Sequence, residues 1–251
     1  MKKTTLVNIF LRSFFIHTTL NFKRMQNMGF AMSVIPLIKE LRFKKMESEK
    51  FLNTHLQMFN THPYFSAPII GSIVRLEEEN IFKEDVADAV SIKQSLMASY
   101  AAIGDIFFWG AFRPFIAIIS VVLIYTGMVL APLFYFMTYN PIHFWVRLKG
   151  FMEGYRQGKK GFEFIRSLNL PGISVTIRRV SLMVLIALML WLSRHSGYWP
   201  LIETYGVVVK LTALATVMFC LLLFKKGISQ IYVVYSAFVI FVIISWTGWI
   251  H

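Results

Sequence analysis

The sequence predicts an all-α polytopic membrane protein, a transmembrane helix bundle with re-entrant, broken helical hairpins and an N-terminal amphipathic helix. Three observations support this fold class. Of the 251 residues, 56% are hydrophobic and the mean hydropathy is +0.58, whereas an ordinary soluble domain is about 45–50% apolar. Residues 114–146 contain no charged side chain, and this uncharged stretch is long enough for a membrane span. The basic residues lie mainly outside such apolar runs, as in membrane proteins that obey the positive-inside rule.

The net charge of +13 favours membrane lipids with anionic headgroups as partners of the basic residues. No basic stripe is interleaved with aromatic side chains, so the charge does not indicate a nucleic-acid-binding protein. Cys220 is the single cysteine and lies in an apolar run, which excludes an internal disulfide and a multi-cysteine metal site.

The first part of the chain divides into an interfacial segment and a membrane core. Residues 1–50 carry ten Lys/Arg against three Glu and mix polar with apolar positions, which predicts amphipathic helices at the membrane surface. Residues 51–146 are expected to form the core, and the string FNTHPYFSAP (59–68) interrupts it between two helical runs. Because Pro63 disfavours helical backbone at His62, a helix should end near that point.

The distribution of charged residues along the chain predicts the nature of the remaining segments. Residues 77–88 hold six of the thirteen acidic residues and predict an aqueous loop, with Glu77 to Glu79 as a solvated edge. Residues 147–179 contain eight Lys/Arg against two Glu around a Gly/Lys-rich turn, which predicts a basic, cytoplasmic connecting segment. Residues 180–251 hold three apolar runs and are expected to form the C-terminal transmembrane helices.

The first candidate site is the polar group Asn60, Thr61 and His62 before Pro63. These side chains either cap a helix end or are presented to a cavity by a broken helix, as in transporters of hydrophilic substrates. The residues alone leave both interpretations open. His55 and His62 have no cysteine beside them and do not indicate a metal site. No cofactor is expected, since the phosphate-loop, dinucleotide and nucleophile-elbow motifs are absent from the sequence.

The second candidate site is formed by Asp105, Trp109 and Arg113, which are spaced four residues apart and so share one helix face. Ionisable groups within a membrane segment usually face a partner or a water-filled path, because exposure to lipid is costly. Two charged groups that can bind hydroxyls, with a ring that can stack on a pyranose, are typical of a sugar site. The competing interpretation is a structural Asp–Arg pair that fixes the helix register.

Three strings resemble one known family. They are NFKRMQNMGFAMSVIPLIK (21–39), HLQMFNTHPYFSAPIIGSIVRLEEE (55–79) and AAIGDIFFWGAFRPF (101–115). Over roughly residues 1–160 the chain is similar to the membrane IID component of the mannose–fructose–sorbose family of the bacterial sugar phosphotransferase system (PTS). The family commonly has Tyr-Glu-Arg-Met-Gln where this chain has Phe22 to Gln26 with Lys23, and Gly-Pro-Leu-Ala-Gly where it has Ser99-Tyr100-Ala101-Ala102.

The resemblance implies a multi-pass subunit of the bacterial inner membrane that pairs with a IIC subunit, as a trimer of IIC–IID heterodimers. The pair would bind and translocate a hexose or amino sugar, while cytoplasmic IIA and IIB carry the phosphoryl group, so this subunit is not expected to be an enzyme. The alternatives are a structural partner of IIC that makes no sugar contact, and an embedded enzyme. The implied sugar-binding residues are Asn60, Thr61, His62, Asp105, Trp109 and Arg113, with Pro63 and Pro114 in the same strings.

Overall fold

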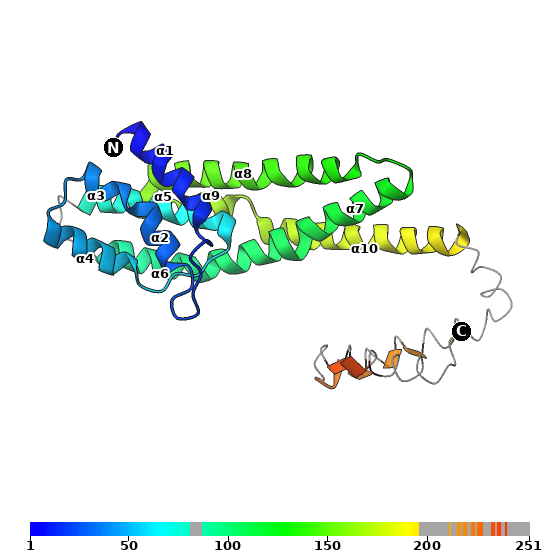
Figure 1. Cartoon of the computed structure of the whole chain (residues 1–251). Coiled ribbons are helices and arrows are strands. Elements are labelled where there is room, and N and C mark those ends of the chain that lie inside the picture. The colour runs from blue at the N-terminus through cyan, green and yellow to red at the C-terminus, as the bar shows by residue number, and fades with distance from the viewer. Residues whose placement is uncertain are drawn as a thin grey trace. The chain divides into compact units, whose positions relative to one another are not determined.

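The protein is all-helical in the computed structural model, which describes residues 1–80 and 87–195 and scattered positions between 211 and 239 (Figure 1). Cys220 and the apolar runs expected to span the membrane beyond residue 195 lie outside the continuously described residues. The chain divides into two compact units, Met1–Ile186 and Ala187–His251, and the first contains both candidate sites.

Short helices make up the N-terminal part of the first unit. Pro36 stands at the first turn of its helix, where a missing N–H removes no hydrogen bond. The first helix buries Ile9, and its exposed positions are both polar (Thr4, Asn8) and apolar (Val7, Leu11). In order, the elements are α1 (Lys3–Arg12), the 3-10 turn η1 (Ser13–Phe15), α2 (Asn27–Val34), α3 (Pro36–Glu40) and α4 (Lys45–His55).

Longer helices follow. Two stretches of the described chain are long and apolar enough to cross a membrane, Ala89–Tyr125 and Phe162–Leu192. The chain reverses over residues 126–130, and the helix after this turn runs without interruption through the expected segment boundary at residue 146. The elements are α5 (Ser66–Asn80), α6 (Ala87–Gly104), the π-helix η3 (Asp105–Phe112), α7 (Arg113–Tyr125), α8 (Ala131–Gln157), η4 (Gly158–Lys160), α9 (Phe162–Ser167) and α10 (Leu170–His195).

Helices α5 and α8 pack closely because glycines line their contact. A Cβ atom on Gly154 would lie 2.4 Å from the carbonyl oxygen of Pro68, and one on Gly71 would lie 2.3 Å from that of Phe151. Small residues let helix backbones approach in this way in membrane bundles. Gly154, which lies just before the Gly/Lys-rich turn, therefore serves the packing of α8 against α5.

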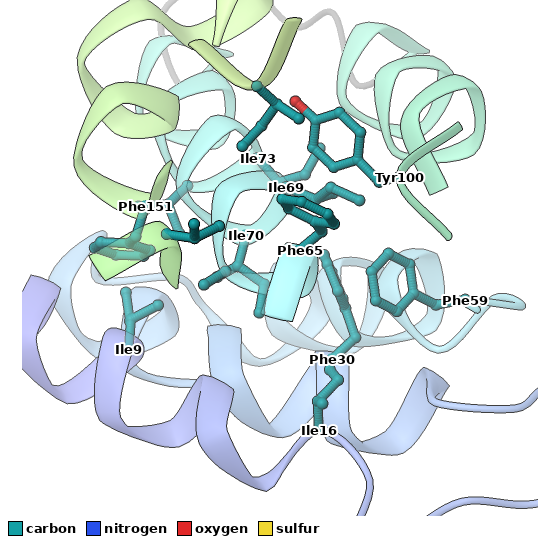
Figure 2. Close-up of a cluster of buried hydrophobic side chains, with 14 of the residues drawn as sticks. Ile9, Ile16, Phe30, Phe59, Phe65, Ile69, Ile70, Ile73, Tyr100 and Phe151 are labelled. Atoms are coloured by element: carbon teal, nitrogen blue, oxygen red, sulfur yellow. The ribbon is translucent and has the colours of Figure 1, made fainter. Parts of the chain in front are cut away.

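The core gathers around α5. Ile69, Ile70 and Ile73 of this helix are fully buried, and Figure 2 shows them between Phe151 and Tyr100 on neighbouring segments. On the N-terminal side, the rings of Phe30 and Phe59 lie 4.6 Å apart between centroids. Phe59 and Phe65 are both fully buried and bracket the string 60–64, so they anchor the polar tip at both ends.

Candidate functional site

The tip between α4 and α5, residues 56–65, begins with a turn at residues 56–57 and an isolated β-bridge from Phe59 to Met25, and it ends with one 3-10 turn, η2 (Pro63–Phe65). Helix α4 ends at His55, earlier than the proline alone predicts. His62 has the extended backbone that a following proline favours (φ −62°, ψ 133°). Its Nδ1 accepts a hydrogen bond from the backbone N–H of Tyr64 at 3.3 Å, so His62 itself caps η2.

Gln26, which the sequence analysis did not single out, clamps this tip. Its Nε2 donates to the carbonyl oxygen of Thr61 (2.7 Å), and its Oε1 accepts from the N–H of the same residue (3.2 Å). Its own backbone N–H donates to the carbonyl of Phe59 (2.8 Å). Gln26 is buried, and both ends of its side-chain amide are satisfied by the backbone N–H and C=O of one residue of the tip, Thr61.

The tip rests on the second candidate site. The ring of His62 stacks on Phe108 (centroids 5.3 Å apart, planes at 16°) and lies 4.8 Å from the ring of Trp109. Gly104 permits this approach, because a Cβ atom there would lie 2.3 Å from the Cβ of His62. The two strings predicted separately from the sequence are thus in direct contact.

The string from Asp105 to Phe112 is a π-helix, a rare form that is often found at functional sites. Asp105, Trp109 and Arg113 are all exposed, and 47% of the Trp109 surface is accessible. Among the described residues neither Asp105 nor Arg113 has an ion-pair or hydrogen-bond partner, and they are not paired with each other. The structural Asp–Arg pair considered above is therefore not formed in this chain.

Buried polar atoms surround the inner side of the tip. Arg147 is only 4% exposed and donates from Nη2 to the carbonyl of Pro63 (2.9 Å), with its guanidinium over the rings of Phe14 and Tyr64. It has no carboxylate partner in the described chain. Such unpartnered buried atoms are uncommon in proteins, and four of those in the described ranges lie around the tip: Thr61 Oγ1, His62 Nε2, His143 Nδ1 and Arg147 Nε.

A second buried polar group lies away from the tip and corrects one sequence prediction. Glu77 was expected at a solvated edge but is 6% exposed, and its Oε1 lies 3.2 Å from His55 Nε2. Lys93 is fully buried, donates to the carbonyl of His55 (3.4 Å) and lies over the ring of Phe30. Burial holds the pKa of His55 below its ordinary value, so its ring is neutral near pH 7.

The arrangement at the tip is suited to binding a polar, uncharged ligand. An exposed indole face, a carboxylate and a guanidinium lie on one flank, and the His62 ring packs against the indole. Asn60, two residues before His62, is half-buried, and its side chain makes no hydrogen bond to the described chain. In the part of the chain that the structure describes, no three or more His, Cys, Asp or Glu side chains gather as a metal site would require.

These features define a helical membrane protein with a polar site beside one of its long apolar helices. The sequence matches the PTS system mannose/fructose/sorbose family IID component over residues 1–194, and the chain belongs to this family. It is 36% identical over 153 residues to the PTS system mannose-specific EIID component of Escherichia coli (strain K12), a match that covers 60% of this chain. The matched region spans 54% of that relative's length.

Solved structures share the fold. One chain, from a structure described only as a membrane protein, superimposes with a TM-score of 0.71 at 25% identity, covering 98% of this chain and 97% of the other. A chain of the cryo-EM structure of the mannose transporter ManYZ in complex with microcin E492 (MceA) superimposes with a TM-score of 0.60 at 24% identity, covering 99% and 97%. The family resemblance and the all-α membrane fold predicted from the sequence are confirmed.

Proposed function

We propose that this chain is the IID subunit of a sugar permease in the bacterial inner membrane, and that together with a IIC subunit it binds and translocates a hexose or amino sugar. Cytoplasmic IIA and IIB would phosphorylate the sugar. The observation that carries the proposal is the contact of His62 with Trp109, because it brings the two family strings together in one place. Asn60 and Thr61 adjoin His62, while Asp105 and Arg113 flank Trp109.

The chemistry of this flank fits a sugar. The half-exposed ring of Trp109 offers an apolar face to the C–H side of a pyranose. Asp105 accepts hydrogen bonds from hydroxyls and Arg113 donates them, and neither is occupied by another described side chain. Hydrogen bonds to charged groups contribute about 1.5–3 kcal/mol each, so two such groups and one ring are enough to hold a small neutral ligand selectively.

The charged side chains on this flank must also be shielded from the lipid hydrocarbon. A carboxylate and a guanidinium on a membrane helix are costly against hydrocarbon, and they normally face protein or water. A partner subunit of related hydrophobicity that leaves a wet path beside Trp109 would meet this need. This argument supports a IIC subunit on the Asp105–Arg113 flank.

The test is sugar uptake by cells that co-express this chain with its IIC, IIA and IIB partners. We expect Trp109→Ala and Asp105→Asn to reduce uptake at least about tenfold, the effect of losing one good contact, while the purified complex keeps its IIC subunit. Trp145→Ala is the matched control, because Trp145 is 51% exposed on α8 away from the tip. Normal uptake by both variants would mean that this subunit supports IIC without touching sugar.

A further inference from the structure

The turn between α1 and α2, residues 21–25, presents a fully exposed aromatic side chain. Phe22 has a relative exposure of 107%, and no other large apolar side chain in the described ranges is as exposed. Lys23 and Arg24 follow it and are also exposed. Phe22 and Arg24 are of the residue types that are enriched at protein–protein interfaces, where aromatic side chains serve as anchors in pockets of the partner.

The turn is rigid. The N–H of Asn21 donates to the carbonyl of Met25 (3.0 Å), the N–H of Met25 donates back (2.9 Å), and Asn21 Oδ1 accepts from the N–H of Arg24 (2.8 Å). Met25 adopts a left-handed backbone (φ 57°) to close the turn. Because these bonds fix the backbone on both sides of Phe22, little backbone conformational entropy remains to be lost when its side chain is buried by a partner.

The base of the turn is bonded to the candidate sugar-binding tip. The N–H of Phe59 donates to the carbonyl of Arg24 (3.3 Å), and Arg24 Nη1 donates to the carbonyl of Leu56 (3.2 Å). Gln26, the residue directly after the turn, holds Thr61 through both polar atoms of its side-chain amide. Any displacement of the turn is therefore passed to the tip through hydrogen bonds rather than through a flexible linker.

We infer that this turn docks into an apolar socket with an acidic rim on the partner membrane subunit, and that docking sets the position of the tip. This inference rests on the proposed function, which supplies the IIC subunit as the partner. Lys23 has no carboxylate partner among the described residues, so the acidic group is expected on the other side of the interface.

The connection of the turn to the Trp109 flank favours a protein partner over lipid. In Figure 1 the loop between α1 and α2 projects away from the neighbouring helices. Through Thr61 and His62 it is joined to the flank of Trp109. That flank carries the unpaired Asp105 and Arg113, which hydrocarbon cannot cover at low cost.

Labelling of an introduced cysteine tests the contact directly. Lys23→Cys, in a Cys220→Ser background, is treated with a charged maleimide in membranes that contain the subunit alone or the subunit with IIC. We expect rapid labelling without IIC and labelling at least about tenfold slower with it, as for a residue in a stable interface. Met46→Cys is the matched control, since Met46 is 82% exposed on α4, and its labelling rate should not change.

Affinity provides the second readout. Phe22→Ala should reduce the fraction of IIC that co-purifies about tenfold. Lys23→Glu should also reduce this fraction, whereas Lys23→Arg, which keeps the positive charge, should leave it unchanged. Val129→Ala is the control, because Val129 is 89% exposed in the α7–α8 turn. All of these side chains are exposed, so the variants should fold.

Three results would overturn the docking inference: equal labelling with and without IIC, protection that is already complete without IIC, or full retention of IIC by Phe22→Ala. The second result would indicate burial in lipid. Loss of uptake in the Trp109 variant with no protection at Lys23 would remove the docking inference and leave the proposed function. Protection at Lys23 with normal uptake in the Trp109 and Asp105 variants would remove the proposed sugar contact and leave the docking inference. A wild-type subunit that never co-purifies with IIC would remove both.

Discussion

His62 depends for its position on a residue without a side chain. Gly104 lies directly under the His62 Cβ, and the space that it leaves open is what allows the imidazole to reach Phe108 and Trp109. Gly104 therefore contributes to the candidate site by its small size, whereas Asp105 beside it contributes a carboxylate.

Gly104→Ala should displace the tip, because the new methyl group meets the Cβ of His62, an atom that cannot move without its backbone. We expect sugar uptake to fall at least about tenfold, as misplacement of about 1 Å in a site commonly causes. Gly110→Ala in the same π-helix is the control, since its Cβ meets only the carbonyl oxygen of Asp105 at 3.3 Å. Equal uptake by the two variants would show that the His62 contact does not matter.

The sequence singled out the candidate site residues, which remain a prediction, but not the residues that hold them in place. Asp105, Trp109 and Arg113 stand out because charged side chains are rare in apolar segments. Gln26 and Arg147 do not stand out, since their partners Thr61 and Pro63 are 35 and 84 residues away along the chain. Periodicity and local spacing carry no information on contacts of that range.

At the scale of elements, the sequence did not predict the π-helix η3, although it did predict that Asp105, Trp109 and Arg113 share one helix face. The prediction assumed an α-helix of 3.6 residues per turn. A π-helix is wider, and residues four apart then fall just short of one turn instead of just beyond it. Asp105, Trp109 and Arg113 remain on one flank in either form, so the functional inference did not depend on the helix type.

The α5–α8 contact gives a prediction about stability. Gly154→Leu would place a side chain against the carbonyl of Pro68, only 2.4 Å from the new Cβ, and the helices would have to separate. Overpacking of this kind typically costs about 1–3 kcal/mol. The midpoint of thermal unfolding in detergent should therefore fall, whereas Met152→Ala on the exposed side of α8 should change it little. An unchanged midpoint for Gly154→Leu would contradict the close packing.

At the scale of the whole first unit, the buried group of His55, Glu77 and Lys93 ties the N-terminal helices to α5 and α6. Burial lowers the pKa of His55 in the folded protein, so below about pH 6.5 the unfolded chain takes up a proton that the folded chain resists. The stabilisation is thus fully present above about pH 6.5 and is lost as the pH falls towards the lowered value.

Thermal unfolding in detergent at pH 7.5 and pH 5.5 checks this dependence. We expect the wild-type midpoint to fall more between these values than that of His55→Gln, because glutamine does not titrate and keeps a polar group beside Glu77. Other histidines contribute equally to both proteins, so the difference isolates His55. Identical pH dependence in the two proteins would show that His55 is not held neutral.

The clamp of Gln26 on Thr61 also sets an order of assembly. Both residues lie in the first quarter of the chain, and a ribosome releases them before it synthesises η3, because chains emerge from the N-terminus. The Gln26–Thr61 hydrogen bonds can form as soon as those first segments are outside, whereas Gly104, Trp109 and Arg147 arrive later. The contacts of the site thus become available in the direction of translation, with the bond from Arg147 to Pro63 last.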